Sequence, residues 1–285
     1  MRTYNFVRYD VNGIALGGNT LHGVQTVTLG RSMDVTTIVT KGRPTTVNNW
    51  YKKPSVTVSF TRFLSGDRYT TFSLLTDTAI KTPPGTVDID ISPIDGAGIK
   101  ARECRLKSLS FNLTNEGNFT ESVTYEGVTF ESGSVGHYDT PEYGTVLRRQ
   151  DFLFGTLPSE VSGKHILTAE AAININYGHI PTWGQFNTNF SSYISVPVDI
   201  TCSFEVLETS IASYVSDYST DQFGHGIFTG SINPQSISIN SGGPVVNLGS
   251  QNFISNVERT GGDVGGTYTI YKYTYRNTNN YFSVT

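Results

Sequence analysis

Apolar and polar residues alternate along several short stretches of the chain, with the period of two that is typical of half-buried β-strands. The two clearest stretches each begin at a proline, Pro54 and Pro197. Their apolar faces consist of Val56, Val58 and Phe60 after the first proline and of Val198, Ile200, Cys202, Phe204 and Val206 after the second. The pattern therefore predicts two similar strands in different parts of the chain.

The period of the pattern changes directly after each of these strands. Apolar residues then fall three or four positions apart, which is the spacing of one face of a short amphipathic helix. These residues are Tyr69, Phe72 and Leu75 in the first case and Ile211, Tyr214, Val215 and Tyr218 in the second. Ser65 and either Thr209 or Ser210 are suitable N-cap residues. Each strand is thus expected to lead into one helix.

These two strand-and-helix segments divide the chain into similar halves. Pro54 and Pro197 are 143 positions apart (197 − 54) in a chain of 285 residues. A long polar loop precedes each proline, at 41–53 and at 183–196. A period of this size indicates a duplicated domain rather than a solenoid repeat.

The remaining pattern predicts a β-rich architecture in both halves. Further strands are predicted at 24–29, 35–39, 87–91, 105–113, 123–130, 146–154, 171–177, 227–232, 236–239 and 267–275. We therefore predict a mainly β protein with two tandem β-sandwich or small-barrel domains, 1–132 and 146–285, joined by a turn-rich linker at 133–145. Each domain is expected to have one short flanking α-helix.

Composition and charge narrow the class of protein. Hydrophobic residues make up 37% of the chain and aromatic residues 12%, which argues against intrinsic disorder. The net charge is −4, with 16 Lys+Arg and 14 Asp+Glu in residues 1–150 but only 4 and 10 in residues 151–285. This balance argues against a basic nucleic-acid-binding protein. The two cysteines are too few for a disulfide framework, and no secretory signal or transmembrane run is visible, so we expect synthesis in the cytoplasm.

Signatures of enzymes and of cofactor sites are absent from the sequence. The five histidines are scattered without the spacing of metal ligands. Asp88 and Asp90 alternate with isoleucines, so a solvated strand face explains them better than a calcium site or a glycosidase pair. We expect no catalytic residue, no metal and no cofactor, and therefore no enzyme.

The two long loops are the segments most expected to contact a partner. Loops of this length in compact β domains usually have a function, and exposed aromatic residues mark protein interfaces. The candidate contact residues are Lys41, Arg43, Trp50, Tyr51, Trp183, Phe186, Phe190 and Tyr193. The alternative is that these aromatic side chains fold back on their own domain.

The order of two strands, a long polar loop, a proline-led strand, one short helix and more strands resembles the tail tube proteins of tailed bacteriophages. Members of that family have a β-sandwich or small barrel with one flanking helix, and they stack as hexameric rings. This chain is similar to the doubled form, in which two fused tube domains let a trimer build a pseudo-hexameric ring. The resemblance covers nearly the whole chain outside the linker and is one of pattern, since the family has no invariant signature.

The resemblance implies a structural protein of the virion tail, made in the host cytoplasm, whose partners are copies of itself and other tail proteins. DNA would pass through the channel without specific binding, and no membrane would be involved. Inner strands would form a barrel that lines the channel, including 33–40 with 55–64 and 171–177 with 198–206. The loops would reach the next ring. The acidic second half fits the acidic channel wall of the family, whereas the first half does not.

Two other interpretations remain open. The chain could be a baseplate or distal-tail ring protein built on the same fold. It could also be a carbohydrate-binding β-sandwich or adhesin that uses the loop aromatics as stacking platforms. A tube subunit is expected to form rings or filaments at high concentration, whereas a lectin is expected to be a monomer whose melting temperature rises with sugar.

Overall fold

The computed structural model describes residues 13–39, 46–64, 85–92, 98–133, 146–181, 190–208, 218–220, 226–228, 233–261 and 269–284. The prediction of a mainly β protein is confirmed for these ranges, whose single helical element is one turn of 3-10 helix, η3 (Arg149–Asp151). The predicted helices at 65–75 and 209–217 fall outside the described residues, as does nearly all of the linker. Within the described ranges, no helix is long and apolar enough to cross a membrane.

Most strands belong to two sets that follow each other along the chain. The first set is β3 (Val24–Val39), β4 (Thr46–Phe63), β5 (Val87–Ser92), β6 (Gly98–Thr114), β7 (Thr120–Gly127) and β8 (Thr129–Gly133). The second set is β9 (His165–Asn174), β12 (Asp199–Glu208), β15 (Gln235–Asn240), β16 (Val245–Gly261), β17 (Thr269–Asn277) and β18 (Ser283–Val284). The other strands are β1 (Gly13–Leu16), β2 (Asn19–Thr20), β10 (Tyr177–Pro181), β11 (Phe190–Ile194), β13 (Tyr218–Thr220) and β14 (Gly226–Phe228).

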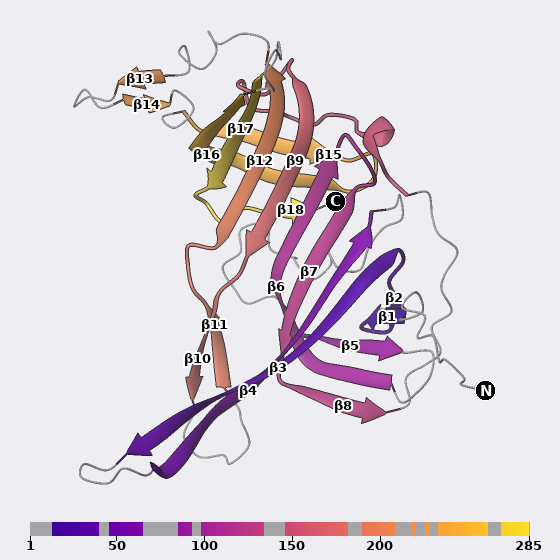
Figure 1. Ribbon diagram of the computed structural model, residues 1–285, viewed down its shortest axis with the longest axis vertical. Helices are drawn as coiled ribbons and strands as arrows, with labels where there is room; N and C mark the ends of the chain where they lie inside the picture. The colour runs from indigo at the N-terminus through magenta and orange to yellow at the C-terminus, as the bar shows by residue number, and fades with distance from the viewer. Residues whose placement is uncertain are drawn as a thin grey trace.

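The two sets have the same pairing order. Strands of the first set pair in the order β3-β4-β7-β6, and strands of the second set pair in the order β9-β12-β17-β16. β5 and β8 then pair with β6, just as β15 and β18 pair with β16. All these pairings are antiparallel, and a further antiparallel pairing of β6 with β9 joins both sets into one 14-stranded sheet (Figure 1).

Irregularities in the pairing also fall at matching places. Lys107 is an extra residue in β6 opposite β7, and Ser255 is an extra residue in β16 opposite β17. Gln25 is an extra residue in β3 opposite β4, and Leu167 is one in β9 opposite β12. Because a bulge fixes the register of its strand, these four residues define which positions of the two sets are equivalent.

The long strand β6 turns from one layer of strands into another, and the buried apolar residues of both sets form one continuous core cluster. The N-terminal part of β6 pairs with β5 and β8, whereas its C-terminal part pairs with β7 and β9. In Figure 1, β5 and β8 run across the direction of β3 and β4. The predicted apolar faces of β4 and β12 are confirmed, since Val58, Phe60, Cys202 and Phe204 are at most 2% exposed.

One equivalent buried position differs sharply between the two sets of strands. In the first set, Arg62 of β4 lies opposite Glu121 of β7, and their side chains form an ion pair that is completely buried. At the equivalent place in the second set, Val206 of β12 lies opposite Tyr271 of β17, and both are completely buried. The same site is therefore filled by a charged pair in one set and by an apolar and an aromatic side chain in the other.

Several predicted elements have other boundaries. A single strand, β3, replaces two predicted strands, because a bulge near Met33 absorbs the irregularity without ending the pairing. The predicted strand at 146–154 is wrong, because Arg148–Asp151 form a turn in which the Asp151 carboxylate accepts a hydrogen bond from the Arg148 N–H. Tyr218, predicted at the end of a helix, begins strand β13.

Candidate assembly surfaces

The structure describes four of the eight predicted contact residues. Lys41, Arg43, Trp183 and Phe186 lie outside the described residues. Trp50 and Tyr51 lie on β4 opposite Thr36 and Val35 of β3, and Phe190 and Tyr193 lie on β11 opposite Pro181 and Gly178 of β10. The four described contact residues therefore lie in two separate hairpins, two residues in each.

The prediction of two long loops is wrong where the segments are described. Residues 46–53 continue strand β4, and residues 190–194 form strand β11. Antiparallel pairing uses main-chain groups, so a polar segment without alternation can still be a strand when a partner strand lies beside it. The loops are therefore the outer parts of two β-hairpins.

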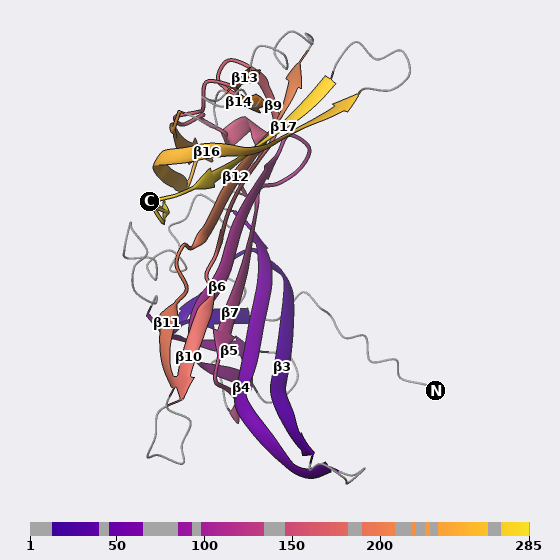
Figure 2. The ribbon, with the colours of Figure 1, turned by 90° about the vertical axis from the view of Figure 1, so that its left-hand side faces the viewer.

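Both hairpins project from the same end of the large sheet (Figures 1 and 2). The pairing of β4 with β7 stops at Val56, so residues 46–55 of β4 pair only with β3 among the described residues. Among the residues that the structure describes, the outer hairpin formed by β3 and β4 consequently has no strand partner on either side. Such edges are sites where another chain can add a strand.

Tyr193 is the one predicted contact residue whose side chain is described. Its side chain is 49% exposed. The ring lies over Gly178 of the neighbouring strand, and a Cβ atom at Gly178 would overlap the ring. Tyr193 thus covers its own hairpin with one face, as the alternative interpretation expects, while about half of the residue stays exposed.

An internal joint connects the two sets of strands. Strand β6 of the first set pairs with β9 of the second in seven antiparallel pairs, from Ser108 opposite Asn174 to Thr114 opposite Thr168. On the core side of this joint, Phe111 and Ala171 lie opposite each other, and each is 1% exposed. The joint is therefore a continuous, apolar strand pairing.

The strands equivalent to β6 and β9 in the other set have edges that pair with no further strand among the described residues. The counterpart of β9 is β3, which pairs only with β4, and the counterpart of β6 is β16, whose segment Ser255–Gly261 pairs only with β17 among the described residues. Leu29 of β3 is 37% exposed, although its equivalent in β9, Ala171, is buried. Each set thus offers the same two edges, and the chain uses one of each internally.

The face of the large sheet opposite the core consists mostly of small hydroxyl-bearing side chains. Three cross-strand hydroxyl pairs lie on it: Ser32 with Ser55 at 2.8 Å, Ser59 with Thr124 at 3.0 Å, and Thr61 with Ser122 at 3.2 Å. Its charges are largely paired across strands: Lys107 with Glu126 at 3.0 Å, Arg276 with Asp199 at 3.2 Å, and Lys272 with Glu205 at 3.7 Å. This face therefore offers few free cations to a polyanion.

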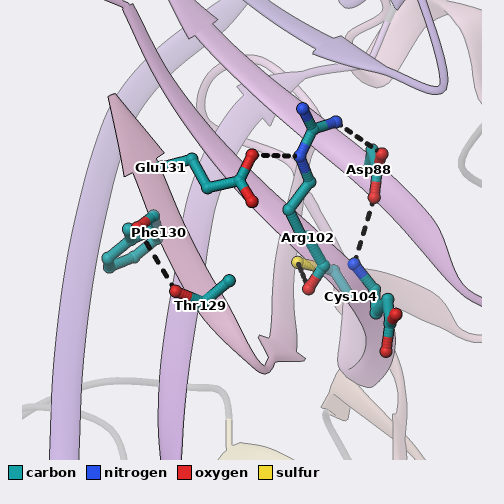
Figure 3. Close-up of polar contacts among 7 residues, drawn as sticks. Asp88, Arg102, Cys104, Thr129, Phe130 and Glu131 are labelled. Carbon is teal, nitrogen blue, oxygen red and sulfur yellow. Dashed lines mark hydrogen bonds and ion pairs between the residues drawn. The ribbon is translucent and has the colours of Figure 1, made fainter. Parts of the chain in front are cut away.

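A cluster of charged side chains links β5, β8 and the N-terminal part of β6, which run across the direction of β3 and β4 (Figure 3). Arg102 of β6 pairs with Asp88 of β5 at 2.6 Å and with Glu131 of β8 at 2.9 Å. Partial burial acts to raise the pKa of Asp88, but the hydrogen bond from the Glu103 N–H and the Arg102 guanidinium lower it on balance. Glu103 has a positive φ of 51°. The cluster holds an unfavourable backbone conformation at the place where β6 turns between layers.

A cavity lies beside the internal joint. It has a volume of about 550 Å³ and is lined in part by Phe119, Phe152, Phe154, Arg149, Lys164 and His165. In the part of the chain that the structure describes, no group of three or more His, Cys, Asp or Glu residues could hold a metal ion. Both cysteines, Cys104 and Cys202, are free and buried.

Comparison of the sequence with known protein families finds no matching family model, and comparison with curated proteins finds no match. Support for a function comes instead from the geometry of this chain. Its most distinctive features are the repeated pairing order, the internal joint and, among the described residues, the two open edges.

Proposed function

We propose that this chain is a structural subunit of a bacteriophage tail tube, in which three copies form a pseudo-hexameric ring and the rings stack around a DNA-conducting channel. Its two sets of strands are two tandem tube domains, within 1–132 and 146–285. The observation that carries the proposal is the internal joint between β6 and β9, together with the open counterparts β16 and β3. The β6–β9 pairing within one chain is the same type of contact that, repeated between chains, would build a ring.

A joint of this kind is heterologous, because the two edges that meet are different. Heterologous contacts that repeat with a constant rotation generate closed rings or open helices. If β16 of one copy pairs with β3 of the next, every contact around the ring is equivalent to the internal joint. Three copies then supply six equivalent domains, and no sheet edge of this type is left open.

The projecting hairpins supply a second type of contact. The β3–β4 and β10–β11 hairpins extend beyond the sheet at one end, where they would reach the ring above or below (Figure 2). The exposed part of Tyr193 and the unpaired edge at residues 46–55 of β4 support this role. Stacking through these hairpins would extend a ring into a tube.

The hydroxyl-rich face of the sheet is the surface proposed to line the channel. Three of its cations, Lys107, Lys272 and Arg276, pair with carboxylates of the same face, and Arg105 lies opposite Glu126. Phosphate binding relies on free cations, so DNA would move past this face without being held. The protein would reside in the tail of the virion after synthesis in the host cytoplasm, with other tail proteins as further partners.

Negative-stain microscopy of the purified chain over a range of concentrations tests the proposal. The expected result is rings with six-fold appearance whose mass, measured by light scattering, corresponds to three chains, and stacks of these rings at higher concentration. Rings that never stack would favour a baseplate or distal-tail ring protein. A monomer at all concentrations whose melting temperature rises with a glycan would replace the proposal with a carbohydrate-binding function.

A shortened hairpin tests the stacking contact separately. Deleting residues 37–49 and joining Thr36 to Trp50 through Asn-Gly keeps the register of the remaining hairpin, because these residues are opposite each other. Rings without stacks are the expected result. A variant of full length with Ser and Thr at positions 37–49 is the control, since it keeps the backbone edge and removes the side chains. Normal tubes from the shortened chain would contradict the role of the hairpin.

A further inference from the structure

The two open edges carry arginines at positions where the internal joint is apolar. By the equivalence of the bulges, Arg31 of β3 corresponds to Ile173 of β9, and Arg259 of β16 corresponds to Phe111 of β6. Ile173 and Phe111 are 0% and 1% exposed, whereas both arginines are exposed. The same two positions are thus apolar where the joint is closed within the chain and cationic where the edge is open.

The register of the internal joint predicts where these arginines meet. In that joint Leu109 lies opposite Ile173, and Phe111 lies opposite Ala171. The equivalent joint between two copies places Val257 opposite Arg31 and Arg259 opposite Leu29, with all four side chains on the core side of the sheet. Arg259 and Arg31 of the next copy are then diagonal neighbours, about 7–8 Å apart and within reach of long side chains.

Two arginine side chains this close repel each other, and no neighbouring carboxylate offsets the repulsion among the described residues. The second half of the chain has four cations, and the other three each pair with a carboxylate: Lys164 with Glu208, Lys272 with Glu205, and Arg276 with Asp199. None of the carboxylates that the structure describes forms an ion pair with Arg259 or Arg31. The residue opposite Arg259 is Tyr271, and the residue opposite Arg31 is Val56.

We infer that the edges β16 and β3 of neighbouring copies join in this register, and that Arg259 and Arg31 act as a charge gate that keeps the joint open at low ionic strength. The inference rests on the proposed function and specifies its ring contact. Inward-pointing charges on edge strands are a common means of preventing uncontrolled strand pairing. The chain can therefore keep two open edges and remain unassembled until salt or the contacts of a growing tube offset the repulsion.

A charge-reversal cycle tests the gate in the full-length chain by sedimentation velocity at about 0.05 M and about 0.5 M NaCl, where screening lengths differ severalfold. The wild type is expected to assemble better at high salt. Arg259→Glu and Arg31→Glu each turn repulsion into attraction, so each single variant assembles at about tenfold lower protein concentration at low salt and is weakened by added salt. The double variant restores like charges and returns to wild-type behaviour. Single variants that assemble like the wild type, or a double variant that assembles as well as the single variants, would overturn the gate.

Cysteine cross-linking tests the register. Thr28 and Thr260 are opposite each other in the proposed joint, so oxidation of Thr28→Cys/Thr260→Cys should link neighbouring copies into covalent oligomers. Ser32→Cys/Thr260→Cys is the matched control, because Ser32 lies opposite Asn256 and is out of disulfide range of position 260. If the variants still form ring stacks but cross-links appear only in the control, or in neither variant, the proposed register of the joint is wrong. The proposed function as a tube subunit is not contradicted by that result. A chain that forms no ordered assembly at any salt concentration overturns the proposed function.

Discussion

The buried pair of Arg62 and Glu121 allows a sharp test of the equivalence between the two sets of strands. Both side chains are completely buried, and the equivalent positions of the second set hold Val206 and Tyr271. We predict that Arg62→Val alone destabilises the protein strongly, whereas Arg62→Val/Glu121→Tyr restores stability. The double variant installs the pair that the chain already uses at the same place in its other half.

The magnitude follows from the difference between removing one charge and removing both. Removing one partner of a buried ion pair costs about 3–5 kcal/mol, because the other charge stays buried without compensation. For a chain of this size such a loss corresponds to a fall in melting temperature of roughly 6–20 °C. Replacing both partners by packed apolar side chains is often neutral. The smaller valine leaves room for the larger tyrosine, so we expect the double variant within about 1 kcal/mol of the wild type.

The effect of pH on the single variant has a defined sign. Burial raises the pKa of Glu121 above its ordinary value of 4.5, and the Arg62 guanidinium offsets part of that rise. Without Arg62, only the raising effect of burial remains. A carboxyl group whose pKa is raised by folding stabilises the fold below its unfolded pKa and loses that contribution as pH rises through its folded pKa. The deficit of Arg62→Val should therefore be largest at neutral pH and shrink in acid.

Scanning calorimetry of the wild type, the single variant and the double variant between pH 4 and pH 8 measures these differences. The reasoning is refuted if Arg62→Val costs less than about 1 kcal/mol at pH 7, or if the double variant is as unstable as the single one. A deficit that grows in acid would show that Glu121 is not the group left uncompensated.

Three further predictions concern single positions. Glu103→Gly should stabilise the fold by about 1 kcal/mol in thermal unfolding, since Glu103 has a φ of 51° and a residue with positive φ favours glycine. Gly155→Ala should lower the melting temperature, because the added Cβ overlaps the carbonyl of Ser238, and overpacking costs roughly 1–3 kcal/mol. Burial raises the pKa of Cys104 to about 12, so a thiol reagent at mildly alkaline pH should titrate neither cysteine until the protein unfolds.

Each of these predictions has a contradicting outcome, and the glycine substitution also has a matched control. Gly85→Ala is the control for Gly155→Ala, because a Cβ at Gly85 meets nothing within 4 Å; equal melting temperatures for both variants would contradict the predicted overlap. A lower melting temperature for Glu103→Gly would show that the Glu103 side chain contributes more than its backbone costs. Rapid labelling of the folded protein would contradict the burial of the thiols, which the cross-linking experiment also requires.

Much of the fold follows from local properties of the sequence. Val58 and Phe60 alternate with hydroxyl-bearing residues, and so do Cys202 and the residues around it, because one face of each strand is buried and the other is not. Alternation between buried and exposed positions involves only a few consecutive residues, so it can be recognised in the sequence without knowing the partner strand. The order of elements around Pro54 and Pro197 carried the prediction of a duplication, although no single stretch of residues is closely shared.

The tertiary structure decided what depends on distant partners. Residues 46–53 look like a loop in the sequence, yet they form a strand because β3 lies beside them and pairs with their main-chain groups. Arg62 interrupts an apolar face, and only the position of Glu121 on β7 explains its burial. Arg259 of β16 stands where β6 has Phe111, but a single charged residue in a strand does not by itself show that its edge is open. Which edge is joined is set by strand pairing between residues far apart in the chain, so it becomes visible only when the sheet is assembled.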